Sequence, residues 1–208
     1  MNPQSSNPNR MFAEMLKSAR QALELRDPAD AARAAGVEYD PARRAFRVST
    51  LGETVEISLP DCAFSPALPE WHQLVILHCL SRADGTPPGG EWIAMGQMRD
   101  GLVRGSKCDR EAGARIGALL GGLSPEDAGT VCRALGGEPV EGKADFSCVL
   151  PFLPRWPVML NLWFADDEFD GSARLLVDKS ADHYLSIEDA VAVTDILIAR
   201  LAENCRLV

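Results

Sequence analysis

Residues 145–189 read DFSCVLPFLPRWPVMLNLWFADDEFDGSARLLVDKSADHYLSIED and contain the most hydrophobic segment of the chain and its densest group of acids. Apolar residues alternate with other residues over 146–150, which is typical of a half-buried strand, and residues 158–164 are apolar on both faces except at one asparagine. An acidic turn over 165–171 and a returning strand over 173–177 follow. This segment therefore predicts strands joined by an acidic turn.

Two further features of the same segment concern breaks and caps. Prolines at 151, 154 and 157 are expected to break the chain between the first two strands, since proline has no backbone N–H. Ser186 and Asp189 resemble a capping box with aspartate in place of Glu or Gln, which predicts a final helix to about Glu203.

The remaining periodicities predict a mixed architecture. Prolines and glycines indicate loops over residues 61–69 and 85–90. Helical spacing and end signals indicate helices over residues 11–26, 28–36, 70–81, 108–120 and 124–136, whereas period-two spacing indicates a hairpin over 46–59 and a short strand at 92–95. We predict a single α+β domain over residues 11–208, after a disordered lead-in of residues 1–10, with one mainly antiparallel sheet and helices mostly on one face.

The composition excludes several classes of protein. The chain has 208 residues, of which 46% are hydrophobic, and its net charge of -9 disfavours binding to nucleic acids and anionic membranes. It shows no signal-peptide core and no apolar run long enough to span a bilayer, so a soluble cytoplasmic protein is expected. Six scattered cysteines, several in apolar runs, are typical of buried free thiols in a reducing compartment.

Residues 137–144, GEPVEGKA, match the glycine and lysine spacing of a phosphate-binding loop. That chemistry needs a hydroxyl after the lysine, a strand before the loop and a helix after it. Ala144 has no hydroxyl, the predicted order of helix and strand is reversed, and two glutamates would repel phosphate. We interpret this segment as a connection.

The acidic turn offers the sharper candidate site. Carboxylates at Asp166, Glu168 and Asp170 before Gly171 imitate the first half of a calcium loop, but the twelfth position is Val177 instead of a bidentate glutamate. Eight acids stand against two bases between residues 166 and 189. The turn is therefore either solvated or a surface for a divalent cation or a basic partner.

Histidines and arginines suggest weaker alternatives. Asp178 and His183 are close enough in the chain for a carboxylate to orient an imidazole, although no nucleophile is evident. His72 and His78 are six residues apart, which places them on different helix faces. The basic residues over 99–115 form either an anion site, a docking site for the acidic turn or a salt-bridged surface, and interspersed acids favour the last.

The chain also resembles a known family, the prokaryotic domain of unknown function 3786. The resemblance covers about residues 40–201 and depends on residues 90–93 (GEWI), 135–137 (LGG), 145–147 (DFS) and above all 153–189. In that last block an LPR-proline strand, an acidic turn and a helix with an early glutamate, here Glu188, follow one another as in the family.

Members of this family occur largely in anaerobic bacteria and archaea, and some carry a cysteine-rich iron–sulfur module like that of corrinoid iron–sulfur proteins. This chain has no cysteine before Cys62, so no intrinsic iron–sulfur cluster is expected. Asp170 and Val177 stand where the family more often has proline and phenylalanine. The resemblance implies a fold and an anaerobic setting, but no established activity.

We therefore favour a non-enzymatic binding or accessory protein of anaerobic metabolism, beside iron–sulfur or corrinoid enzymes, with a protein partner or a small ligand. The expected recognition residues are Asp166, Asp167, Glu168, Asp178, His183 and Glu188. The alternative is an enzyme that uses the same carboxylates with His183, around a divalent cation or as acid and base on a small substrate.

Overall fold

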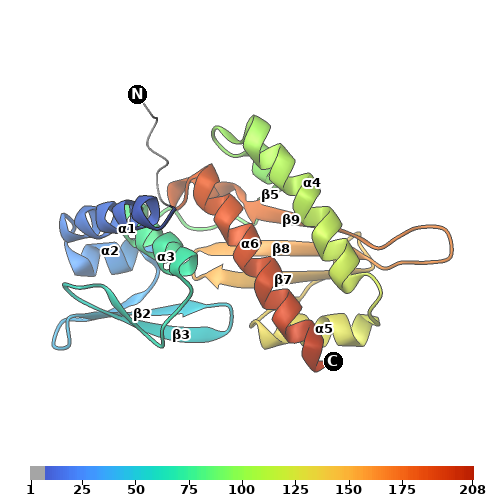
Figure 1. Ribbon diagram of the computed structural model, residues 1–208, viewed down its shortest axis with the longest axis horizontal. Coiled ribbons are helices and arrows are strands. Elements are labelled where there is room, and N and C mark those ends of the chain that lie inside the picture. Colours follow the sequence, from blue (N-terminus) through green and yellow to red (C-terminus); the bar gives the residue numbers. More distant parts are fainter. Residues whose placement is uncertain (1–7) are drawn as a thin grey trace.

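The computed structural model describes residues 8–208, which form two antiparallel β-sheets with helices packed against them (Figure 1). Residues 1–7 of the predicted lead-in lie outside the described residues, and residues 8–10 already belong to the first helix. The N-terminal part of the chain comprises α1 (Pro8–Glu24), α2 (Pro28–Ala35), β1 (Glu38–Asp40), β2 (Ala45–Thr50), β3 (Glu53–Ser58), β4 (Ala63–Ser65) and α3 (Glu70–Arg82).

The C-terminal part builds the second sheet. Its elements are β5 (Trp92–Ile93), η1 (Met95–Gln97), α4 (Gly101–Leu120), α5 (Pro125–Ala134), β6 (Glu138–Pro139), β7 (Phe146–Leu153), β8 (Trp156–Trp163), β9 (Ser172–Asp178), η2 (Lys179–His183), α6 (Ile187–Asn204) and η3 (Cys205–Leu207). The strand order is β1-β2-β3-β4 in the first sheet and β5-β9-β8-β7-β6 in the second. The α+β fold class is confirmed.

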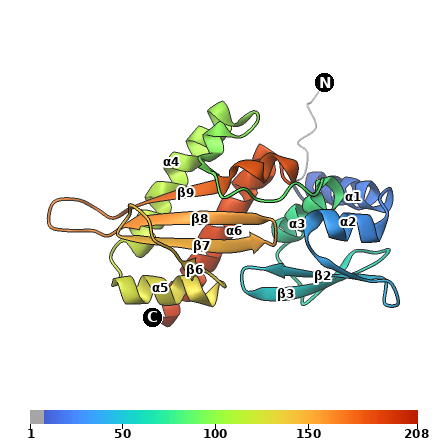
Figure 2. The same cartoon turned by 180° about the vertical axis from the view of Figure 1, so that it is seen from behind.

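Helices cover one face of each sheet. In the first sheet, α1, α2 and α3 lie on one side of β2 and β3 (Figure 1), and Phe46, Val48, Val55 and Ile57 of these two strands are buried. In the second, α4 and α6 cross one face of β7, β8 and β9, and Figure 2 shows the opposite face of these strands from behind. This agrees with the predicted placement of the helices.

The prediction of one sheet was wrong. The hairpin of β2 and β3 pairs at its edges with β1 and β4, which complete a separate sheet. These edge strands have three residues each, too few to show a period of two in the sequence. The expected loop over residues 61–69 therefore contains a strand, and the connection over 137–144 begins with β6.

The two sheets share one core. The turn between β2 and β3 lies against β7, where Leu51 N–H donates to the carbonyl of Pro151 at 3.0 Å. The rings of His72 and Phe152 stack across the same junction with centroids 5.3 Å apart. Buried apolar side chains from both sheets consequently form one continuous cluster.

Strands β7, β8 and β9 fulfil the prediction for the C-terminal segment, apart from its prolines. Leu160 pairs with Cys148 on one side and with Leu175 on the other, so all three strands bury the same face. Only Pro154 lies in the turn between β7 and β8, whereas Pro151 and Pro157 lie within the strands. The ladder shifts register around Pro151, and a bulge of this kind accommodates the missing N–H.

Helix α4 begins at Gly101, seven residues before the predicted start at Cys108, because its glycines are not helix breakers. A Cβ atom at Gly105 would collide with the carbonyl of Met95, and one at Gly117 would collide with the carbonyl of Gly171. These glycines therefore form a helix face that lies directly on other backbone segments.

The predicted caps are confirmed. Ser124 and Ser186 cap α5 and α6, and Asp189 completes the capping box of α6. Asp27 caps α2, which ends at Gly36 in the left-handed conformation.

None of the helices within residues 8–208 combines the length and the apolar character needed to cross a membrane.

Candidate functional site

The acidic turn is the connection between β8 and β9. Asp166 is fully exposed, and its Oδ1 accepts the backbone N–H groups of Glu168 at 2.9 Å and Phe169 at 2.7 Å. The hydrogen bond from Glu168, followed by that from Phe169, lowers the pKa of Asp166. Both hydrogen bonds lie within the loop, so the carboxylate of Asp166 stabilises the turn that contains it.

The tip of this loop exposes an aromatic ring among carboxylates. The side chain of Phe169 is 70% exposed, and Asp167, Glu168 and Asp170 are exposed beside it. Within residues 8–208, none of these three acids has a salt-bridge partner. We call residues 166–170 the acidic loop.

The base of the acidic loop is fixed. Ala165 N–H donates to the carbonyl of Gly121 at 2.8 Å, and Gly171 lies so close to Gly121 that a Cβ on either would meet the other's backbone. Phe164 N–H donates to Asp145 at 3.0 Å. Figures 1 and 2 show the connection between β8 and β9 projecting from one end of the molecule.

Asp178 occupies the opposite end of β9 and is buried. Its carboxylate accepts the N–H groups of Gly89 at 3.2 Å, Gly90 at 2.7 Å and Ser180 at 2.9 Å. Burial alone would raise the pKa of Asp178, but the hydrogen bonds from Ser180 and the two glycines outweigh it and lower the pKa. Asp178 therefore holds the connection between α3 and β5 against the end of β9.

His183 contacts the same connection between α3 and β5, at the surface of the molecule. Its Nδ1 lies 2.6 Å from Asp84 and 3.2 Å from Thr86 Oγ1. The hydrogen bond from His183, then those from Thr86, lowers the pKa of Asp84 to about 2. Glu188, in the first turn of α6, instead pairs with Arg104 of α4 at 2.8 Å.

The six residues predicted to form one recognition surface therefore lie in two places. Asp166, Asp167 and Glu168 precede β9. Asp178 is the last residue of this strand, and His183 and Glu188 follow it, so the two groups are separated by a strand of seven residues, or roughly 20 Å. The two groups cannot act on one ligand of ordinary size. Within residues 8–208, no three His, Cys, Asp or Glu side chains are arranged to hold a metal ion.

Comparison with known proteins agrees with the resemblance. Residues 27–200 match the family model described as "Domain of unknown function (DUF3786)". The chain belongs to this family. The match begins at residue 27, earlier than the predicted 40, so it includes α2 and β1 of the first sheet. No curated protein and no solved structure matches the chain significantly.

The DUF3786 chain contains a buried network that the sequence did not reveal. Asp189 of α6 accepts hydrogen bonds from His78 Nδ1 at 2.5 Å, from Arg82 at 2.8 Å and from the hydroxyl of Ser186 at 2.6 Å. Burial would raise the pKa of Asp189, but the hydrogen bonds from His78 and Ser186 lower it. The network therefore connects α3, which carries His78 and Arg82, to the start of α6.

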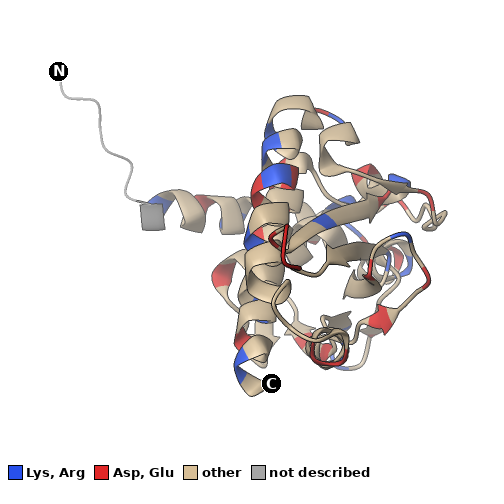
Figure 3. Cartoon of the chain, turned by 90° about the vertical axis from the view of Figure 1, so that its right-hand side faces the viewer, with Lys and Arg blue, Asp and Glu red and all other residues tan. Residues whose placement is uncertain are grey.

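The other predicted clusters have structural roles in the DUF3786 chain. Three of the five basic residues over 99–115, namely Arg104, Lys107 and Arg115, pair with Glu188, Glu111 and Asp195, as a salt-bridged surface predicts. In Figure 3, basic and acidic segments accordingly lie close together along the long helices. His72 and His78 have separate partners, as their spacing predicted.

All six cysteines are free thiols, and all but Cys205 are buried. Cys132 of α5 and Cys148 of β7 are neighbours in the core. A hydrogen bond between their thiols, followed by burial, raises the pKa of Cys132, and the same bond lowers the pKa of Cys148. The predicted buried free thiols are confirmed.

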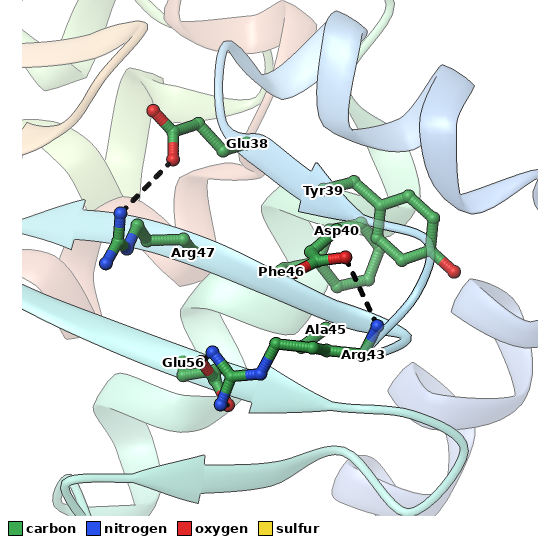
Figure 4. A pocket seen from close by; sticks show the side chains of 8 residues that line it. All are labelled: Glu38, Tyr39, Asp40, Arg43, Ala45, Phe46, Arg47 and Glu56. Carbon is green, nitrogen blue, oxygen red and sulfur yellow. Dashed lines mark hydrogen bonds and ion pairs between the residues drawn. The ribbon is translucent and has the colours of Figure 1, made fainter.

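A pocket of about 210 Å³ on the outer face of the first sheet was also not predicted (Figure 4). Arg43 lies 2.7 Å from Glu56, Arg47 lies 3.6 Å from Glu38, and Asp40 accepts the N–H of Arg43. Each charge at this pocket already has a partner in the DUF3786 chain. The acidic loop, whose carboxylates have no such partners within residues 8–208, is therefore the stronger candidate.

Proposed function

We propose that this protein is a non-enzymatic binding or accessory protein of anaerobic metabolism and that the acidic loop alone is its recognition surface. The observation that carries the proposal is the exposure of Phe169, 70%, at the tip of a loop rich in carboxylates. An exposed aromatic ring among carboxylates is suited to anchor a partner, because aromatic anchors dominate the affinity of many interfaces. The family resemblance supplies the anaerobic setting, beside iron–sulfur or corrinoid enzymes.

The loop favours a basic protein partner with an apolar pocket. Asp167, Glu168 and Asp170 present negative charge around the ring, and the net charge of -9 adds long-range attraction for basic surfaces. The turn formed by Asp166 and the anchored base restrict the conformations of the loop, so less conformational entropy is lost on binding. A small ligand is less well supported, because the loop projects outward.

The enzymatic alternative is not favoured by any observation. It requires His183 beside the loop carboxylates, whereas His183 is hydrogen-bonded to Asp84 and Thr86 beyond the far end of β9. Asp178 is likewise occupied by backbone N–H groups.

The experiment compares matched baits in a quantitative pull-down from native lysate. We expect Phe169→Ala to lower capture of the specific partner by at least about tenfold, since loss of an interface anchor costs about 2 kcal/mol. Asp167→Lys should lower it similarly, and capture by the wild type should weaken as salt is raised.

Glu141→Lys is the matched control, because it makes the same charge change at an exposed position outside the acidic loop. It should capture the partner like the wild type. Equal capture by Phe169→Ala and the wild type, or no stable partner for the wild type at all, would count against the proposal.

A further inference from the structure

Two buried cysteines from different elements of the C-terminal part are in contact. Cys132 lies in the last turn of α5 and Cys148 lies in β7, and neither side chain is exposed. Their thiols share a hydrogen bond. A Cβ atom added at Gly137 would lie 2.7 Å from the carbonyl oxygen of Cys132 and 2.7 Å from Sγ of Cys148, so both residues meet the chain at the same point. We call Cys132 and Cys148 the dithiol pair.

The hydrogen bond makes the two thiols chemically different. It lowers the pKa of Cys148, although burial opposes the shift, and the positive charge of Arg133 acts in the same direction as the bond. It raises the pKa of Cys132, as burial also does. The thiolate is the reactive form of cysteine, so Cys148 is the stronger nucleophile of the pair and Cys132 is a thiol held beside it.

The dithiol pair lies near the edge of the molecule. Figures 1 and 2 show α5 at the periphery, beside the C-terminal end of α6. Cys205, which directly follows α6, is half-buried and close enough to Cys132 for its charge to affect the pKa of Cys132. Helix α5 has only ten residues, and a short peripheral helix opens by local unfolding more readily than the centre of a sheet. A small uncharged oxidant can therefore reach the pair.

We propose that the dithiol pair is an oxidative modification site, at which hydrogen peroxide converts the two thiols into a reversible disulfide. The sulfur of Cys148 attacks one peroxide oxygen, the O–O bond breaks, and the released hydroxide takes the thiol proton and leaves as water. The sulfur of Cys132 then attacks the sulfenic acid on Cys148. The S–S bond forms, the S–O bond breaks, and a second water leaves with the proton of Cys132. The two sulfurs lose two electrons in all, and peroxide gains them.

The disulfide would link the end of α5 to β7 and close a loop that contains β6. Cys79 is the contrasting case. It is also buried, and burial, followed by the negative charge of Asp189, raises its pKa to about 12. Among the groups within residues 8–208 that shift this pKa there is no other thiol. We therefore expect Cys79 to stay reduced when the pair is oxidised. Oxidation of the pair is independent of recognition by the acidic loop.

Mass spectrometry of the whole chain tests the site. Reduced protein is treated with increasing hydrogen peroxide, free thiols are blocked with N-ethylmaleimide in denaturant, and the chain is cut with trypsin without reduction. Cys132, Cys148 and Cys205 fall on separate peptides, residues 116–133, 144–155 and 201–206. We expect the first two peptides to appear joined, two hydrogens lighter than their sum, and dithiothreitol to separate them. Cys79 should carry the maleimide throughout.

Single variants identify the role of each thiol. Cys132→Ala should lose the link and leave a sulfenic acid on Cys148, which dimedone labels when the treated protein is unfolded. Cys148→Ala should lose the link and give no dimedone label at Cys132. Cys205→Ala is the matched control, because it removes a neighbouring thiol outside the dithiol pair and should keep the link.

Met11, whose side chain is 56% exposed, reports how far oxidation has gone, because peroxide converts exposed methionine to its sulfoxide. Absence of the joined peptides once Met11 is fully oxidised would overturn the proposal. A disulfide that joins Cys132 to Cys205 instead, or a dimedone label at Cys132 in Cys148→Ala, would overturn it as well. The peptide map of the wild type gives a result even if an alanine variant fails to fold.

Discussion

At the residue scale, each of the three histidines depends on one specific neighbour. His72 is buried, with its Nε2 2.8 Å from the hydroxyl of Thr50, and burial, followed by the positive charge of Arg200, lowers its pKa to about 4. His78 and His183 contact Asp189 and Asp84 instead. His72 is therefore a neutral side chain in the folded protein at neutral pH.

The neutral state of His72 predicts a pH-dependent stability. Between about pH 6.5, the ordinary pKa of histidine, and about pH 4, the unfolded chain binds a proton at this position that the folded chain does not. The contribution of His72 is full above this window, and the free energy of unfolding should fall by up to about 3 kcal/mol as pH drops through it. Urea titrations across the window should show a clearly smaller fall for His72→Gln.

Glutamine retains polar groups for Thr50 but does not titrate, so the comparison isolates protonation at this position. Equal slopes for His72→Gln and the wild type would show that the loss of stability at acid pH has another origin.

The residue scale also shows what the sequence could and could not predict of the candidate site. The acidic loop was identified correctly as a turn, because charge and glycine content are local properties of the chain. Asp189 was identified as a capping residue, but its partners His78 and Arg82 are more than a hundred positions away, and no spacing signals such a contact. Asp178 was grouped with the loop because sequence distance understates the length of an extended strand.

At the element scale, helix α4 packs unusually closely against the backbone of neighbouring segments. Gly105 lies against Met95, Gly113 against Ala173 and Gly117 against Gly171. Asp109, which falls between these glycines, accepts the N–H groups of η1 at Met95 and Gly96. The helix thereby fixes both η1 and the base of the acidic loop.

Gly117→Ala tests this contact. Alanine favours a helix by about 1 kcal/mol relative to glycine, but its Cβ would collide with the carbonyl of Gly171, and we expect a net loss of about 2 kcal/mol of stability. Gly122→Ala is the control, since nothing lies within 4 Å of its added Cβ. Chemical denaturation of both variants measures the difference, and a neutral or stabilising Gly117→Ala would show that α4 can move away.

The start of α4 was missed although its signal is present. Glycines recur at 101, 105, 113, 117 and 121, at intervals of four or eight residues, so successive glycines lie near one another on the helix surface. Glycine is a poor helix former on average, and the prediction of the helix start followed this low propensity instead of the regular spacing. The short strands β1, β4 and β6 were harder, because two or three residues carry no measurable period.

At the scale of the whole molecule, the two sheets share one core, and the junction is polar as well as apolar. Arg200 of α6 pairs with Glu53 of β3, and Leu51 donates to Pro151. We therefore expect the sheets to unfold together, as a single cooperative unit.

Two tryptophans report on the two parts of the chain. Trp71 lies in α3 beside the first sheet, and Trp156 lies in β8 of the second. Variants that keep only one of them, with phenylalanine at the other tryptophan positions, should show coincident urea midpoints by fluorescence. Circular dichroism of each variant provides the control for lost structure. An earlier transition at Trp71 would mean that the first sheet opens alone and is a separate domain.

The contact of α4 with β9 limits the pairing of other chains with this edge of the second sheet. The carbonyl groups of Gly171 and Ala173 lie against helix backbone, and β5 pairs with the last two residues of β9. An incoming extended peptide therefore finds few vacant hydrogen-bonding groups there. Fibril growth by strand addition on this side would first require α4 to detach from the sheet.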